Sequence, residues 1–163
     1  MLGAIICLII CILNVDSKLA IVMGGIAIGM HIMLIMDQTQ KGNKEKTGMA
    51  IITKAFNLLC NYVIHTVGPI VDKLDIQKIK ELENCYISCL EIARKNKIRS
   101  IAFPAISTGL FHFPKKEASI VAVNTIRSYL KKYPNAFEKI VFNVFTKEDK
   151  TYYDRLFENK KNN

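Results

Sequence analysis

The sequence is poor in the residues that usually build metal and redox sites. It has only three histidines, His31, His65 and His112, and they lie far apart in the chain. It has five cysteines but no Cys-x-x-Cys pair. Zinc sites usually gather such residues at short, regular spacings. The spacing therefore predicts no metal site, and we expect no cofactor.

The cysteines have the surroundings of small buried hydrophobic residues. Cys7 and Cys11 are spaced four residues apart, as are Cys85 and Cys89, and Cys60 stands alone. An odd number of cysteines within apolar segments favours reduced thiols over a disulfide framework. Reduced thiols are typical of proteins in a reducing compartment, so we expect a cytoplasmic protein.

Charge is almost missing from the first 36 residues. Residues 1–15 carry none, and a second apolar run covers residues 19–36. That second run approaches the length of about 20 residues that a membrane span needs. Its glycines favour a buried strand, a glycine-rich bend and a buried helix instead, and a membrane hairpin is the alternative. No basic segment precedes the first run, which argues against a secretory signal.

Acidic residues are the scarcer charged residues. The chain has 14 Asp and Glu against 23 Lys and Arg, a formal net charge of +9. This balance favours anionic partners such as phosphates, nucleotides, nucleic acid or an anionic membrane surface. No block of Lys and Arg forms a nucleic-acid-binding arm, so RNA binding through the basic surface is an alternative and not the favoured function.

Strands and helices alternate along the chain. Residues 76–97 form the clearest predicted helix, because apolar residues recur there every three or four positions. Further helices are predicted at residues 115–132 and 147–159. The alternation predicts an α/β fold, a three-layer α/β/α arrangement with a largely parallel or mixed sheet, as one domain over residues 1–158 with a polar tail. The predicted strands are residues 4–13, 49–54, 61–67, 98–103 and 139–145.

Two predicted strand ends are candidate sites. One is Leu13–Asn14, followed by the bend at Gly24 and Gly25, and the other lies in the stretch AFPAISTGLFHFP, residues 102–114. A buried strand passes there into Ser107, Thr108 and Gly109, and a predicted helix follows. Backbone N–H groups in such a turn, together with the N-terminus of a helix, attract phosphate. Ligands of α/β proteins bind beyond the carboxyl ends of strands, which is where this turn lies. We therefore predict a phosphate-binding turn.

Three residues after this turn have different expected roles. Phe111 offers a flat apolar face to a ribose or a base edge. Phe113 is expected to pack beneath the helix that Pro114 starts. His112 has no catalytic partner beside it in the sequence, so we expect a solvent-facing loop histidine.

Long segments of the chain resemble the macrodomain family, which binds ADP-ribose. They are NYVIHTVGPIV, CYISCLEIARKNKIRSIAFPAISTGLFHFP and KIVFNVFTKEDKTYYDRLF, and KTGMAIITKAFNLLCNYVIHTVGP resembles another ordered family run. The resemblance is close over residues 47–157. It implies a mixed sheet between helices with a cleft for ADP-ribose, and we expect a monomer whose partner is ADP-ribose or an ADP-ribosylated protein.

The resemblance also implies which residues line the cleft. The turn and its flank would wrap the diphosphate with backbone amides, and Phe111 would lie beside the distal ribose. Asn14 matches the first Asn of the family's Asn motif, and in a hydrolytic member it would position the attacking water. Asn143 and Phe145 would lie near the adenosine. The implied binding residues are Asn14, Gly24, Gly25, Ser107, Thr108, Gly109, Leu110, Phe111, Asn143 and Phe145.

Several features of hydrolytic family members are missing. The second Asn of the motif is Ser17 here, and no acidic residue occurs over residues 18–36, where hydrolytic members often have an Asp. Only His31 lies where zinc-dependent bacterial members have a Cys/His cluster. We therefore expect ADP-ribose binding by a macrodomain with a shortened or degenerate N-terminal portion. Hydrolysis of ADP-ribosyl groups from proteins or small derivatives would be weak or lost, and a membrane-associated interaction module is the alternative.

Overall fold

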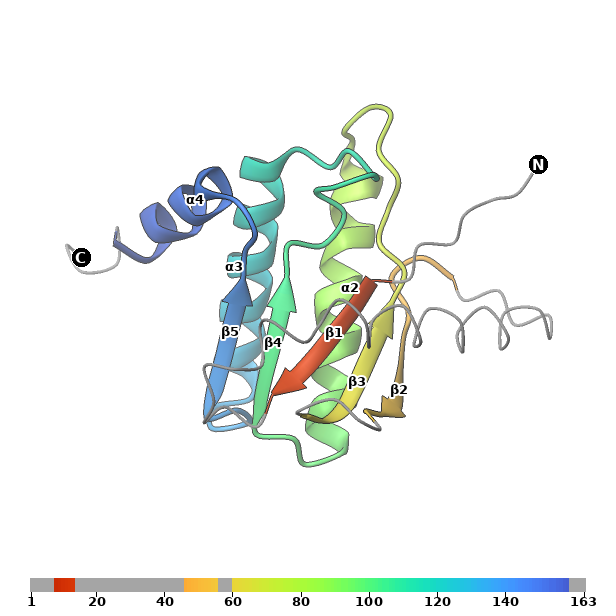
Figure 1. Ribbon diagram of the computed structural model, residues 1–163, viewed down its shortest axis with the longest axis vertical. Helices are drawn as coiled ribbons and strands as arrows, with labels where there is room; N and C mark the ends of the chain where they lie inside the picture. The colour runs from red at the N-terminus through yellow and green to blue at the C-terminus, as the bar shows by residue number, and fades with distance from the viewer. Residues whose placement is uncertain (1–7, 14–45, 56–59, 159–163) are drawn as a thin grey trace.

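The computed structural model describes residues 8–13, 46–55 and 60–158 (Figure 1). Of residues 1–36, for which a membrane hairpin was the alternative, only residues 8–13 belong to this part. None of the helices in the described ranges has the length and apolar character to cross a membrane. The strands are β1 (Leu8–Leu13), β2 (Ala50–Lys54), β3 (Cys60–Thr66), β4 (Ser100–Pro104) and β5 (Lys139–Asn143), and the helices are α2 (Ile76–Lys95), α3 (Lys115–Lys132) and α4 (Lys147–Glu158).

The strands run in both directions. β3 pairs antiparallel with β1 on one side and β2 on the other, while β4 and β5 pair in parallel. β1 also lies beside β4, which brings the two hydrogen-bonded groups together. Figure 1 shows β3, β4 and β5 pointing one way and β1 and β2 the other. The mixed sheet is confirmed.

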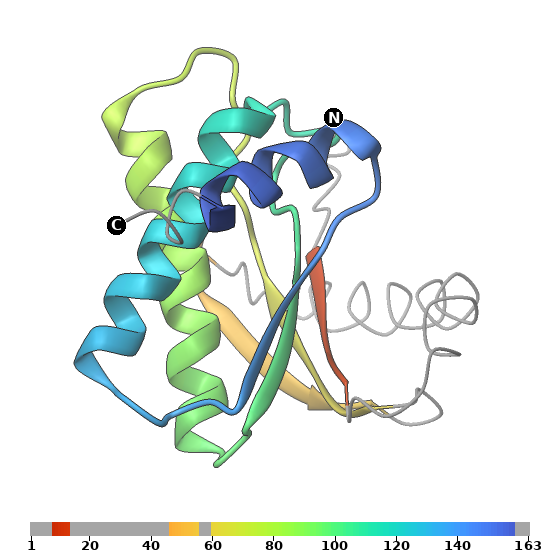
Figure 2. The same ribbon diagram turned by 90° about the vertical axis from the view of Figure 1, so that its left-hand side faces the viewer.

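The described helices α2 and α3 lie side by side on one face of the strands (Figure 2). Their buried sides and the central strands form one apolar core, which includes Tyr86, Phe103 and Phe113. Helix α4 packs on α3, and the ring of Tyr153 on α4 contacts the ring of Phe142 on β5 in a tilted arrangement, with 4.8 Å between the ring centroids. The α/β fold is confirmed, and within the described residues the predicted three-layer arrangement is represented by the sheet and the helices on one of its faces.

Helix α2 confirms the apolar stripe with one exception. Leu82, Cys85, Cys89 and Leu90 are completely buried. Burial raises the pKa of the Cys85 thiol to about 11, so this cysteine is a protonated core residue. Ile76 was expected on the same stripe but is 72% exposed, because the first turn of α2 extends beyond the strands it covers.

Strand β5 differs from the prediction at its end. The sequence KIVFNVF predicts a buried strand over residues 139–145, whereas β5 ends at Asn143 and is only partly buried. Phe145 is fully exposed. The strand must end here because Thr146 caps α4, which begins at the next residue.

Candidate functional site

The predicted turn lies where two parallel strands end. The loop of residues 105–114 leaves β4 at Pro104 and ends at Lys115, where α3 begins. Asn143 at the end of β5 is paired with Pro104 across the parallel ladder. The loop and the β5–α4 junction therefore lie at the same edge of the sheet, as the carboxyl ends of parallel strands should.

The loop is closed by backbone hydrogen bonds. Two of these bonds join residues within the loop, and a third joins the loop to the segment that follows β3. Thr108 Oγ1 also donates to Ala105 O at 3.0 Å. Such bonds fix the path of a loop without any charged side chain. The three backbone bonds are Phe113 N to Ser107 O at 2.9 Å, His112 N to Gly109 O at 3.0 Å, and Val71 N to Phe111 O at 2.9 Å.

Most amides inside the turn have no such partners. Among the described residues, no backbone carbonyl accepts a hydrogen bond from the N–H groups of Ser107 and residues 109–111, while Thr108 follows a turn at Ile106 and Ser107. Ser107 has a left-handed backbone conformation with φ of 63°. Successive N–H groups around a residue of that conformation form a concavity that binds anions. The turn thus offers a row of donors that the described fold does not use.

The start of α3 adds positive potential to the same place. Its N-cap is Pro114, whose side chain makes no capping hydrogen bond. Helix α2, by contrast, is capped by Asp75, whose Oδ1 accepts from Lys78 N at 2.8 Å. The first N–H groups of α3 are thus left without a side-chain cap, and a helix N-terminus favours an anion.

Gly68 lets the turn pack against the segment after β3. A Cβ added at Gly68 would lie 2.1 Å from Ser107 Oγ and 3.0 Å from a methyl carbon of Ile106. Ser107 is buried, and its hydroxyl has no hydrogen-bond partner within the described ranges. Sequence reasoning treated Gly68 only as the end of a strand. Its structural role is to admit Ser107.

The packing of the described residues does not require a glycine at position 109. A Cβ there would meet nothing within 4 Å, and its φ is not in the left-handed region. Leu110 beside it is 75% exposed, and Phe111 is half-buried. A glycine with open space in front of it allows a ligand to approach the backbone closely.

The β5–α4 junction forms the other side of this edge. The exposed residues Asn143 and Phe145 lie here, and Thr146 caps α4. Thr146 Oγ1 donates to Asp149 Oδ2 at 2.6 Å, and Asp149 N donates back to Thr146 Oγ1 at 3.1 Å. Together with the bond from Thr146 N to Asp149 Oδ2 at 3.3 Å, this is a capping box, which satisfies two N–H groups at the start of α4.

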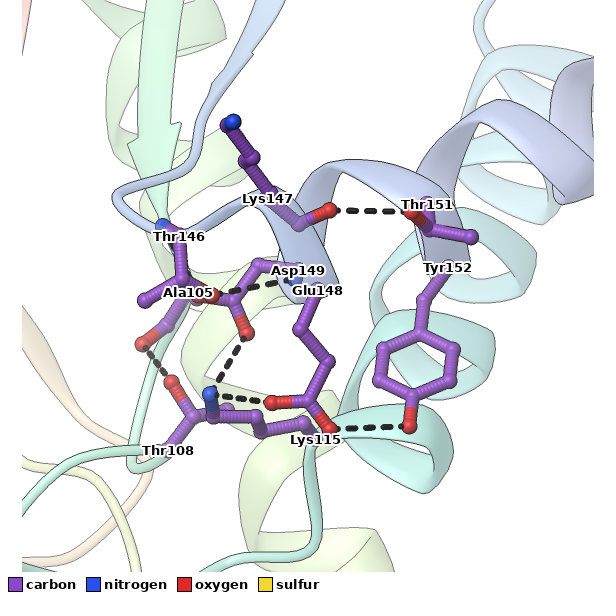
Figure 3. A network of polar contacts seen from close by, with 9 residues as sticks. All are labelled: Ala105, Thr108, Lys115, Thr146, Lys147, Glu148, Asp149, Thr151 and Tyr152. Atoms are coloured by element: carbon purple, nitrogen blue, oxygen red, sulfur yellow. Dashed lines mark hydrogen bonds and ion pairs between the residues drawn. The ribbon is translucent and has the colours of Figure 1, made fainter.

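An ion-pair cluster joins α3 to α4 (Figure 3). Lys115 Nζ lies 2.8 Å from Glu148 Oε2 and 3.5 Å from Asp149 Oδ1. The hydrogen bond from Lys115, followed by the one from Tyr152, lowers the pKa of the Glu148 carboxyl, and the pKa of Lys115 is raised mainly by Glu148. Sequence reasoning missed this cluster, because its members lie on different helices.

Residues 107–111, Asn143 and Phe145 thus lie at or just beyond the carboxyl ends of β4 and β5, at the same edge of the sheet, and their role in binding is a prediction. Asn14, Gly24 and Gly25 lie outside the described residues and stay predictions. Leu13, the last residue of β1, is paired with Cys60 at the amino end of β3. Since the two strands are antiparallel, β1 ends at the opposite edge of the sheet from the carboxyl end of β3. In the described ranges no three His, Cys, Asp or Glu residues gather as metal ligands.

The expectations for Phe113 and His112 are both confirmed. Phe113 is 1% exposed and belongs to the core beneath α3. His112 is exposed in the loop, with a left-handed φ of 55°. His112 is therefore a surface residue of this loop.

Comparison with known families agrees with this geometry. The family model described as Macro domain matches residues 26–122 of the chain. The chain belongs to the Macro domain family. The macrodomain fold predicted from the sequence is confirmed, and the family match includes the whole turn and the start of α3.

Solved macrodomains share the fold. A mutant of the Oceanobacillus iheyensis macrodomain with ADPR has a TM-score of 0.71 and 30% identity, over 82% of this chain and 71% of that one. The Trypanosoma brucei macrodomain in complex with ADP-ribose has a TM-score of 0.70 and 29% identity, over 82% of this chain and 55% of that one.

Curated relatives are longer than this macrodomain. A Staphylococcus aureus (strain COL) protein named protein-ADP-ribose hydrolase is 45% identical over 120 residues. The match covers 72% of this chain and 45% of that protein, so the chain spans about half the length of this relative.

Proposed function

We propose that this macrodomain binds ADP-ribose and that the turn of residues 107–111 holds its diphosphate. The observation that carries the proposal is the row of N–H groups without an internal acceptor, next to the uncapped start of α3. Both features favour a compact anion with several oxygens. Gly109 supports close approach, because no atom stands in front of it.

The nucleoside part of the ligand would extend toward the β5–α4 junction. Phe145 is a fully exposed aromatic residue and Asn143 an exposed amide at the same edge as the turn. An aromatic ring can stack on a base, and an amide can both donate and accept hydrogen bonds. Phe111, half-buried beside the turn, would border the distal ribose.

Two solved relatives support this ligand. The Trypanosoma brucei protein was crystallised with ADP-ribose, and a mutant of the Oceanobacillus iheyensis protein with ADPR. The net charge of +9 is favourable for a ligand that carries two phosphate charges. An ADP-ribosylated protein in the cytoplasm is the corresponding macromolecular partner, bound by a monomer.

Hydrolysis of a protein-linked ADP-ribose is the second candidate function. It is favoured by the name of the Staphylococcus aureus relative, a protein-ADP-ribose hydrolase. No acidic residue occurs over residues 18–36, where hydrolytic members often have an Asp, so the chain lacks a carboxylate base at that place. Loss of a general base costs about 100- to 10,000-fold in rate. We expect binding with little turnover, and release from a mono-ADP-ribosylated protein at the uncatalysed rate would rule hydrolysis out.

Gly109→Glu tests the binding site. The new carboxylate would stand beside the diphosphate, and like charges in contact cost several kcal/mol, so affinity should fall at least about tenfold. The measurement is isothermal titration with ADP-ribose. Gly109→Gln is the matched control, with the same size and no charge, and it should weaken binding less.

Neither substitution should change stability, because a Cβ at Gly109 meets no atom within 4 Å. Equal affinity of wild type and Gly109→Glu would contradict the site. Absence of heat with wild type at sub-millimolar ADP-ribose would contradict the function itself.

A further inference from the structure

One side-chain cluster joins the two chain segments that flank the candidate ligand site. The turn leads directly into Lys115 at the start of α3, and the β5–α4 junction leads into Glu148 and Asp149 in the first turn of α4. The ion pairs of Lys115 with these two carboxylates connect the segments (Figure 3).

The two carboxylate oxygens of Asp149 have different partners. Oδ1 faces Lys115 at 3.5 Å, while Oδ2 accepts from Thr146 Oγ1 at 2.6 Å and from Thr146 N at 3.3 Å. The Asp149 side chain is only 8% exposed, so it has little freedom to leave these partners. Thr146 directly follows Phe145, whose fully exposed side chain has no packing of its own. The cap at Thr146 therefore sets where the backbone of Phe145 lies.

We propose that Lys115, Glu148 and Asp149 are positioning residues, which hold the Phe145 side of the site at a fixed place relative to the turn and thereby set affinity for the adenosine half of the ligand. The inference rests on the proposed ADP-ribose binding. It assigns these residues no contact with the ligand. Lys115 is already engaged by two carboxylates, which balance its charge.

Lys115→Met tests the cluster. Loss of a partly exposed ion pair has a modest effect, so ADP-ribose affinity by isothermal titration should fall about three- to fivefold. Lys115→Arg should retain affinity, because a guanidinium can still contact both carboxylates. Lys150→Met is the matched control: it also removes one positive charge and one ion pair, which Lys150 makes with Asp154 of the same helix.

Glu148→Gln separates positioning from direct phosphate binding. If Lys115 is a positioning residue, Glu148→Gln weakens binding relative to Asp154→Asn, which removes one negative charge from the same helix. If Lys115 binds phosphate directly, Glu148→Gln tightens binding relative to that control. Tighter binding, or equal affinities of Lys115→Met and Lys150→Met, would overturn the inference while leaving ADP-ribose binding intact.

Hydrogen exchange gives a readout that needs no ligand. Lys115→Met should speed exchange of the Asp149 and Lys150 amides, which donate to Thr146 Oγ1 and Thr146 O. The Phe113 amide, bonded to Ser107 O, should keep its rate. Unchanged exchange at Asp149 and Lys150 would overturn the positioning role even if wild type failed to bind ADP-ribose, a failure that would count against the proposed function alone.

Discussion

The two sides of the candidate site are held by different kinds of interaction. The turn side depends on backbone hydrogen bonds, on the contact of Ser107 with Gly68, and on Phe113 buried in the core. None of these interactions involves a charge. The geometry of the turn should therefore respond to changes of volume and be nearly independent of salt and acid.

The junction side depends on charged side chains. The Lys115 and Glu148 side chains that form its ion pair are 32% and 57% exposed. Solvent screens such pairs, and protonation of a carboxylate removes them. The comparison indicates a turn side whose geometry does not depend on charge, where we propose that the diphosphate binds, and a junction side whose position depends on ion pairs. Each prediction below probes one side against the other.

The largest effect is expected for Phe113→Ala. Phe113 is 1% exposed, and truncation of a buried Phe costs about 3–5 kcal/mol in the free energy of unfolding. Phe145→Ala is the matched change on the junction side, where the ring is fully exposed and stability should shift by less than about 0.5 kcal/mol. Urea denaturation measures both. Phe145→Ala should weaken ADP-ribose binding instead, and equal stability losses in the two variants would contradict the comparison.

Gly68→Ala should have the next largest effect. The new methyl would lie 2.1 Å from Ser107 Oγ and 3.0 Å from a methyl carbon of Ile106, so the buried Ser107 side chain must rotate or the turn must shift, at a cost of about 1–3 kcal/mol in stability. ADP-ribose affinity should fall as well, because the amides of residues 107–111 move with Ser107.

The second substitution Ser107→Gly is a rescue for Gly68→Ala. It removes the clashing hydroxymethyl group and tolerates the left-handed φ of 63° at this position. Thermal melting should therefore show the double variant to be more stable than Gly68→Ala alone. A double variant with no recovered stability would show that the Gly68–Ser107 contact does not hold the turn.

Local signals in the sequence predict the elements well. Pro114 and Pro134 bracket α3, and the predicted helix over residues 115–132 agrees with the structure. Helix α2 ends two residues before its predicted boundary at Lys97, whose left-handed φ of 57° turns the chain. The apolar run of β1 predicts a strand, but such a run carries no information on direction, and the antiparallel pairing with β3 appears only in the structure.

Only the turn of the candidate site could be predicted from the sequence. The turn has a local signal, since Ser, Thr and Gly follow a buried strand and precede a helix. The support of the turn by Gly68 and Val71, and the ion pairs of Lys115 with α4, join segments far apart in the sequence. One sequence contains no signal for such pairs, because each partner alone is typical of a turn or a solvated helix surface.

Acid should weaken the junction side alone, and this is the smallest effect. The pKa of Glu148 lies below its ordinary value of 4.5, mainly because Lys115 donates to it. The ion pair therefore stabilises the folded state when the pH is above the ordinary pKa of a Glu carboxyl. This stabilisation is lost as the pH falls through the lower pKa that Glu148 has in the folded state. The difference in unfolding free energy between wild type and Lys115→Met should be constant above about pH 5 and shrink toward about pH 3.

Acid titration of Gly68→Ala is the control for this test. The clash that this substitution creates involves no titrating group, so the stability difference between Gly68→Ala and wild type should stay constant over the same pH range. Glu91, whose pKa is also lowered, mainly by the hydrogen bond from Tyr129, is retained in all three proteins, so its contribution cancels. Urea denaturation at a series of pH values measures both differences. A Lys115→Met difference that persists to about pH 3 would mean that the ion pair does not stabilise the junction. A Gly68→Ala difference that shrinks with it would mean that the two sides are not held independently.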